Sequence, residues 1–164
     1  MTSFELTHVF PGVSVPELFA ALTSPDHQAA QDRANDIERR EVIERFEDAT
    51  RYRCESKIFP RRQLPALLKP IVKGPLELHE VVTWDKTTDT LIYETTPSVM
   101  GGRSKIHSSA QIVPDGSGAK RIYKGQVSVE VKLIGGRVER SIVEDMTRSL
   151  EIATRTTLAF LGRE

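Results

Sequence analysis

The last third of the chain places a long alternating strand directly before a long amphipathic helix. Polar and apolar residues alternate over residues 121–133, and Gly135 and Gly136 follow, where we expect a tight turn whose backbone angles favour glycine. After residue 137, one stripe of side chains recurs at intervals of three or four residues: Val138, Ile142, Met146, Leu150, Ala153, Thr157 and Leu161. A helix of about 24 residues spans roughly 36 Å, which is enough to cross a sheet.

The preceding residues predict a succession of strands interrupted by two short helices. Alternating patterns predict strands at residues 4–10, 37–48, 51–59, 76–85, 90–96 and 105–113. Helices are predicted at 15–23, with Ser14 and Glu17 as a capping box, and at 27–34. Residues 37–48 carry enough charge for an exposed helix, but we prefer a strand on which Val42 and Phe46 share a face.

This order of elements predicts an α+β protein. Successive hairpins favour a curved antiparallel sheet of six to seven strands, accompanied by the two short helices. Only the long C-terminal helix could cover the concave face, because the other two are too short. A strand of some 14 residues must twist and bend, which would leave a hollow between the sheet and that helix.

Residues 60–75 differ from the rest in composition. Prolines at 60, 65, 70 and 75 exclude a regular strand and limit any helix to one or two turns. Leu64, Leu67, Leu68, Ile71 and Val72 are nevertheless apolar. A long apolar loop is expected to cover something, so we interpret this segment as a lid or gate over the hollow.

Composition excludes several functional classes. The 164 residues are expected to form a single domain, 1–164, with 23 basic and 23 acidic residues and therefore no general attraction to nucleic acid. Zero net charge also makes a homodimer plausible. The sequence contains no recognisable signal peptide or apolar run long enough for stable membrane insertion, so a cytoplasmic location is expected by default. Cys54, the one cysteine, is interpreted as a packed thiol.

The organisation of the whole chain resembles the helix-grip superfamily of START and Bet v 1-like domains. A closer resemblance lies in the segment from Val131 to Glu139, which contains the glycine pair and begins the helix. Thr83-Trp84 and the turn Pro114-Asp115-Gly116 are also similar to segments of the bacterial family DUF2505. The resemblance implies a helix-grip fold with a cavity. It implies no particular reaction, since such folds host carriers, enzymes and interaction modules alike.

No motif for catalysis, metal or cofactor binding is recognisable. His8, His27, His79 and His107 lack metal-ligand spacing, and no Gly-rich phosphate loop or nucleophile elbow is present. We therefore expect no metal and no cofactor, and any catalytic residues are unknown. His8 is interpreted as a core histidine with satisfied hydrogen bonds rather than as a ligand contact.

Glu80 is the most suggestive polar residue. It lies between Leu78 and Val82 on an otherwise apolar strand face. If that face is interior, its carboxylate could bind a ligand hydroxyl or act as an acid or base. Alternatively, the face points outward, or an arginine such as Arg53 or Arg40 pairs with the carboxylate.

The candidate ligand-binding residues combine the apolar strand faces, the helix stripe and the gate segment. They are Leu68, Ile71, Leu78, Glu80, Val82, Trp84, Tyr123, Val127, Val129, Met146, Leu150 and Ala153. The leading hypothesis is a non-enzymatic binding or carrier protein for a hydrophobic small molecule such as a lipid, polyketide or isoprenoid-like compound. Two alternatives remain open: a cyclase, aromatase or hydrolase that uses the same cavity, and a protein–protein interaction module with a filled core.

Overall fold

The computed structural model describes residues 1–61, 66–70, 72, 74–98 and 101–163. In chain order the elements are β1 (Thr2–Phe10), α1 (Val15–Leu22), α2 (Pro25–Ala34), β2 (Ile37–Glu47), β3 (Arg51–Pro60), β4 (Leu78–Asp85), β5 (Thr90–Pro97), β6 (Ser104–Asp115), β7 (Gly118–Val129) and α3 (Gly135–Phe160). Within these residues, the strands form one seven-stranded antiparallel sheet in the order β1-β7-β6-β5-β4-β3-β2. The predicted α+β architecture is confirmed, including the preference for a strand over residues 37–48.

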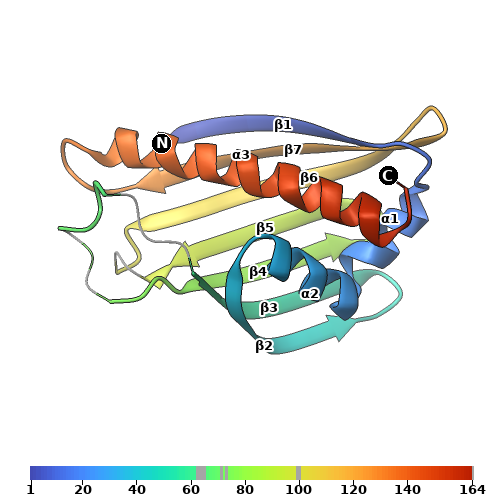
Figure 1. Ribbon diagram of the computed structural model, residues 1–164, viewed down its shortest axis with the longest axis horizontal. Helices are drawn as coiled ribbons and strands as arrows, with labels where there is room; N and C mark the ends of the chain where they lie inside the picture. The colour runs from blue at the N-terminus through green and yellow to red at the C-terminus, as the bar shows by residue number, and fades with distance from the viewer. Residues whose placement is uncertain (62–65, 71, 73, 99–100, 164) are drawn as a thin grey trace.

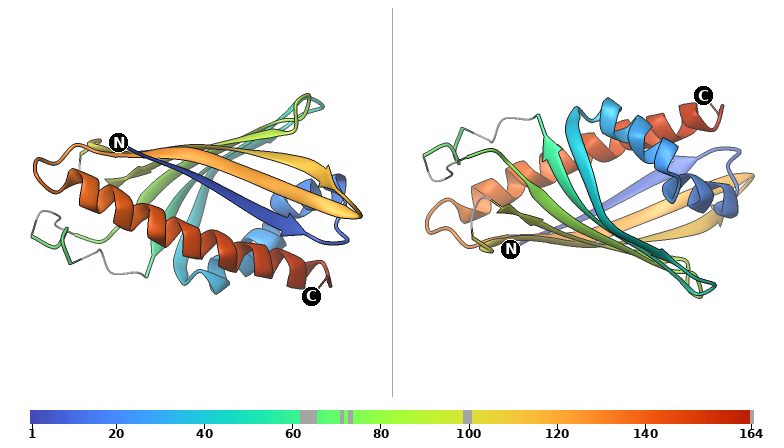
Figure 2. Two further views of the ribbon diagram at one scale, coloured as in Figure 1. Left: turned by 90° about the horizontal axis from the view of Figure 1, so that it is seen from above. Right: turned by 90° about the horizontal axis from the view of Figure 1, so that it is seen from below.

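The sheet curves around α3, which lies along its concave face (Figure 1; Figure 2). Helix α2 packs against both α3 and the edge strand β2, so it covers the concave face on the side that α3 leaves open. No helix within the described ranges is long and apolar enough to cross a membrane.

The capping box predicted at the start of α1 is present. The Ser14 hydroxyl accepts a hydrogen bond from the backbone N–H of Glu17 at 3.2 Å, and the Glu17 carboxylate accepts one from the backbone N–H of Ser14 at 2.9 Å. These contacts fix the helix so that Leu18 and Phe19 enter the core. The Phe19 ring stacks on Trp84 of β4 with its centroid 4.2 Å away.

The junction between β7 and α3 differs in detail from its prediction. Strand β7 ends at Val129 rather than continuing to residue 133, and Leu133 adopts the left-handed conformation with φ of 70°. Neither Gly135 nor Gly136 has a positive φ. Gly135 is instead required by close approach, since a Cβ there would lie 2.6 Å from the carbonyl oxygen of Val129.

Two clusters of buried apolar residues form the core. The first gathers α1, the middle strands and α3, with Phe10, Leu18, Phe19, Leu91 and Tyr123 among its buried members. The second lies near the start of α3 and contains Leu68, Val72, Val127, Val129 and Val138. Residues of the predicted gate segment thus pack against the end of β7 and the beginning of α3.

Strand β2 contains two irregularities in its pairing with β3, between Ile37 and Arg39 and between Val42 and Glu44. The second irregularity changes which side chains share a face. Val42 pairs with Ser56 and Arg45 pairs with Cys54, and all four line the same cavity. The prediction that Val42 and Phe46 share a face is therefore wrong, because the extra residue reverses the alternation after Val42.

Candidate functional site

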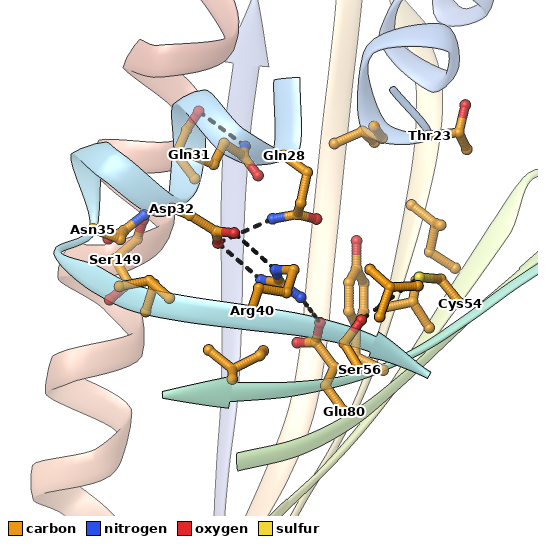
Figure 3. Close-up of a pocket in the computed structure, with 18 of the residues that line it drawn as sticks. Thr23, Gln28, Gln31, Asp32, Asn35, Arg40, Cys54, Ser56, Glu80 and Ser149 are labelled. Atoms are coloured by element: carbon orange, nitrogen blue, oxygen red, sulfur yellow. Dashed lines mark hydrogen bonds and ion pairs between the residues drawn. The ribbon is translucent and has the colours of Figure 1, made fainter. Parts of the chain in front are cut away.

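A partly enclosed cavity of about 250 Å³ lies between the sheet, α2 and the C-terminal half of α3. Its apolar wall is formed mainly by strand residues and roofed by α3: Leu78, Val82, Leu91, Tyr93, Tyr123, Leu150 and Ala153. Its polar wall is formed by Gln28, Gln31 and Asp32 of α2, by the C-cap residue Asn35, and by Arg40, Arg45 and Glu80 of the sheet. The cavity wall is therefore polar beneath α2 and mixed on the sheet, where Arg40, Ser56 and Glu80 lie among apolar side chains (Figure 3).

Three charged residues from different elements form an ion cluster in the polar wall. Arg40 of β2 donates to Asp32 of α2 through Nε at 2.8 Å and Nη2 at 2.9 Å. It also donates through Nη1 to Glu80 of β4 at 3.4 Å (Figure 3). Burial alone would lower the pKa of Arg40, but hydrogen bonds and the charges of the two carboxylates raise it. The arrangement holds Glu80 at the cavity wall, where it shares the positive charge of Arg40 with Asp32.

The ion cluster separates the cavity from a second, more open hollow of about 420 Å³ beside α2 and β2. Asp32, Arg40 and Gln28 line both spaces. Gln28 also donates to Asp32 at 3.3 Å, which orients that carboxylate toward Arg40.

Helix α2 is held on α3 by a buried polar contact. Nε2 of His27 lies 2.9 Å from Oγ1 of Thr157. Because the Thr157 hydroxyl donates its one proton to the carbonyl of Ala153, His27 must be the donor in this contact. Burial, followed by the positive charge of Arg121, lowers the pKa of His27 to about 4, so the imidazole is neutral at neutral pH.

Two tyrosines stand side by side on the sheet surface of the cavity. The rings of Tyr93 and Tyr123 have centroids 5.4 Å apart, and the Tyr123 hydroxyl accepts a hydrogen bond from Ser108 at 2.8 Å. Burial raises the pKa of Tyr93 to about 12 and raises that of Tyr123 as well. Both phenols are therefore protonated at neutral pH and act as hydrogen-bonding groups rather than as bases.

A buried arginine completes the sheet side of the site. Arg121 is only 2% exposed and lines the cavity beside Tyr123. Its Nη2 lies 3.2 Å from Nδ1 of His8 and donates to Oγ1 of Thr154 at 3.2 Å. Burial lowers the pKa of Arg121, yet a guanidinium remains charged at neutral pH.

The structure places half of the sequence-predicted site residues on the cavity wall. These are Leu78, Glu80, Val82, Tyr123, Leu150 and Ala153. Leu68, Val127 and Val129 belong to the second apolar cluster, and Met146 packs against both clusters. Trp84 stacks on Phe19, and Ile71 lies outside the described residues. The prediction that residues 60–75 act as a gate stays a prediction.

The polar wall is what the sequence prediction missed. Arg121 carried a usable signal, because it lies two residues before Tyr123 on the same alternating strand and must share its face. Arg40 was foreseen only as a partner for Glu80. The α2 residues had no comparable signal, since a short polar helix is usually a solvated one. The described part of the chain contains no group of His, Cys, Asp and Glu residues placed to hold a metal ion.

The curved antiparallel sheet around a long C-terminal helix is the START/Bet v 1-like fold. The chain belongs to the family described as "Protein of unknown function (DUF2505)", whose model matches residues 5–161. No curated protein matches it in sequence.

Solved structures share the fold at low sequence identity. Ara h 8.0201 superposes with a TM-score of 0.68 at 13% identity, covering 96% of this chain and 98% of that chain. The Zhui aromatase/cyclase from Streptomyces sp. R1128 has a TM-score of 0.63 at 9% identity, covering 99% and 95%. TTHA0849 from Thermus thermophilus has a TM-score of 0.63 at 12% identity, covering 96% and 98%. At such identities the likeness concerns the fold alone.

Proposed function

We propose that this protein binds a small amphipathic organic molecule in the cavity between the sheet, α2 and α3. The observation that carries the proposal is that the cavity wall combines apolar side chains of the sheet and α3 with polar groups from α2 and the sheet. Apolar surface removed from water at Leu78, Val82 and Leu91 would drive binding at about 25 cal/mol per Å². Polar wall groups would fix the orientation of the ligand.

The size of the cavity narrows the class of ligand. A volume of about 250 Å³ corresponds to about eight water molecules, given roughly 30 Å³ for each. This is slightly below the usual range for drug-sized ligands. The proposed ligand therefore has on the order of ten non-hydrogen atoms, and a long-chain lipid would require the cavity to enlarge.

The residues that line the cavity favour a binding protein over the two alternatives, an enzyme that uses the cavity and an interaction module with a filled core. A cyclase or aromatase of the kind named among the structural neighbours would need a proton-transfer group. No histidine is among the described residues that line the cavity, and Glu80 is paired with Arg40. Burial raises the pKa of each of the three tyrosines there, Tyr52, Tyr93 and Tyr123, so none of them acts as a base at neutral pH. A pure interaction module would be expected to have a filled core rather than this cavity.

Native mass spectrometry of freshly purified protein, combined with solvent extraction, tests the proposal. The wild-type protein is expected to carry a small bound mass or to gain one from a mixture of small amphipathic compounds. Ala153→Leu places a larger side chain in the cavity roof and should abolish that mass. Ala159→Leu is the matched control, because Ala159 is exposed on the same helix.

The two variants separate binding in the cavity from binding elsewhere. Retention of the mass by Ala153→Leu, or its loss in Ala159→Leu, would contradict a site beneath α3. If the wild-type protein binds no member of the mixture, the result contradicts the proposed binding function and favours a protein–protein interaction module.

A further inference from the structure

Arg121 is a buried cation without an anionic partner among the described residues. Its guanidinium contacts His8 through Nε at 3.4 Å and Nη2 at 3.2 Å, and Thr154 through Nη2 at 3.2 Å. Its central carbon lies 5.4 Å from the ring centre of Phe10 and 6.0 Å from that of Tyr123. All of these partners are neutral, since burial and the charge of Arg121 lower the pKa of His8 to about 4.

The contrast with Arg40 makes this arrangement informative. Arg40 has two carboxylates at 2.8 and 3.4 Å, whereas no carboxylate of the described residues lies within 4.0 Å of Arg121. Arginine is rarely buried without a counter-charge, because removing a guanidinium from water is unfavourable unless an anion compensates it. The hydrogen bonds and ring contacts of Arg121 hold the guanidinium in place, but none of them supplies a counter-charge.

Arg121 has hydrogen-bonding capacity that no described residue uses. Nη1 makes no hydrogen bond with any described residue, although Nε and Nη2 are both engaged. Arg121 and Tyr93 both line the cavity, and the Tyr93 hydroxyl likewise has no hydrogen-bond partner among the described residues. Tyr93 is protonated at neutral pH and can donate. The sheet side of the cavity therefore offers a charged donor and a neutral donor.

We propose that the ligand is a small monocarboxylic acid whose carboxylate binds Arg121, with the Tyr93 hydroxyl as a second donor. This inference rests on the proposed function and adds the chemical class of the ligand. The carboxylate supplies the counter-charge that Arg121 lacks, in a charge-assisted hydrogen bond. The apolar body of the acid lies against the sheet residues Val82 and Leu91.

The ion cluster on the opposite wall sets the polarity of the ligand. Arg40 is shared between Asp32 and Glu80, so this cluster carries one surplus negative charge. A carboxylate placed beneath α2 would be repelled by that surplus. The acid group is therefore directed to Arg121, and a hydroxyl or other donor on the body of the ligand could point toward Glu80.

Octanoate and octan-1-ol form a suitable pair of probes, because they share an alkyl chain and fit a ligand of about ten non-hydrogen atoms. Their binding at neutral pH is followed by isothermal titration calorimetry and by amide chemical shifts. The wild-type protein should bind octanoate at least about tenfold more tightly than octan-1-ol, as expected for one charge-assisted hydrogen bond. Arg121→Met should abolish this preference, and Arg121→Lys should retain part of it.

The outcomes distinguish this inference from the proposed function. If octan-1-ol binds as tightly as octanoate, or if Arg121→Met keeps the preference for octanoate, the assignment of the carboxylate is wrong while the binding function stands. If the wild-type protein binds neither probe in the cavity, the proposed function itself is contradicted. Thermal unfolding checks that the variants fold. If Arg121→Met does not fold, the test uses the comparison of octanoate with octan-1-ol on the wild-type protein and the variant Tyr93→Phe. Octanoate binding is expected to weaken several-fold in Tyr93→Phe.

Discussion

Arg121 and His8 face each other across β7 and β1 as directly paired residues, with Nη2 of the arginine 3.2 Å from Nδ1 of the histidine. The imidazole accepts the hydrogen bond through Nδ1, so its own proton resides on Nε2. A neutral histidine thus holds a buried guanidinium in place without neutralising it. Both side chains belong to strand faces that sequence alternation directs inward.

The pKa of His8 should report directly on the charge of Arg121. Burial is the main cause of its reduction to about 4, and the positive charge of Arg121 is the second. Arg121→Met removes only the second cause, so the pKa should rise but stay below 6.5. The measurement is a pH titration of the His8 ring resonances by NMR. An unchanged His8 pKa would show that the guanidinium charge does not act on this ring.

The same substitution should not destabilise the protein at neutral pH. A buried cation without a carboxylate is unfavourable for folding, and a methionine fills similar space without charge. We expect urea unfolding of Arg121→Met to give a free energy of unfolding equal to or above that of the wild-type protein. A loss of more than about 2 kcal/mol, which is typical of a damaged core, would indicate a structural role for Arg121 instead.

Stability should decrease as the pH falls from about 6.5 to about 4. His8 and His27 have folded pKa values of about 4, below the value of 6.5 for an unfolded histidine. The unfolded chain therefore binds protons first, and the stabilisation present above pH 6.5 is lost on acidification. The loss is on the order of 3 kcal/mol for each histidine. Urea unfolding measured over this pH range checks the expectation.

A matched pair of variants separates the histidines from the carboxylates that titrate over the same range. His27→Gln keeps a donor for Thr157 but cannot titrate, so its stability should depend less on pH than that of the wild-type protein. His107→Gln serves as the control, because the His107 side chain is 65% exposed. Equal pH dependence in all three proteins would contradict a buried neutral His27.

Removal of Arg40 should destabilise the protein because it leaves the carboxylates of Asp32 and Glu80 without the cation that they share. The side chains of Arg40, Asp32 and Glu80 are 14%, 17% and 22% exposed, so solvent screens them only partly. We expect Arg40→Met to cost about 2 kcal/mol, less than for a fully buried pair. Adding Glu80→Gln should recover part of that loss, because it removes one of the two carboxylates. Arg39→Met is the control: the Arg39 side chain is 58% exposed, so the variant's free energy of unfolding should stay within about 0.5 kcal/mol of the wild-type value. Additive effects of Arg40→Met and Glu80→Gln would argue against the ion cluster.

The two glycines at the start of α3 should respond differently to alanine. A Cβ at Gly135 would meet the backbone oxygen of Val129 at 2.6 Å, so Gly135→Ala must displace the β7 end and should cost about 2 kcal/mol. A Cβ at Gly136 approaches only the flexible end of Arg140 at 3.6 Å. Gly136→Ala should therefore be neutral or stabilising by up to about 1 kcal/mol. Thermal or urea unfolding of the pair checks this, and equal losses would contradict the close approach.

Much of the fold could be predicted because its signals are local. The alternation before Val129 and the stripe that includes Val138 and Ala153 each repeat with the period of one regular element. Alternation also put Leu78, Glu80 and Val82 on one strand face, and all three line the cavity. The same reasoning failed at Phe46, because the irregularity in β2 is fixed by pairing with β3 rather than by the local pattern.

The sequence by itself determined the order of strands and helices, the capping of α1 and the apolar faces that form the two core clusters. Only the tertiary structure decided that α2 would form a polar cavity wall, that Arg40 would join Asp32 and Glu80, and that Arg121 would have no carboxylate partner among the described residues. The physical reason is the distance along the chain over which each kind of interaction acts. Turns, caps and periodicity act over a few neighbouring residues, whereas charge pairing and cavity shape depend on side chains brought together from distant elements by the packing of the whole chain.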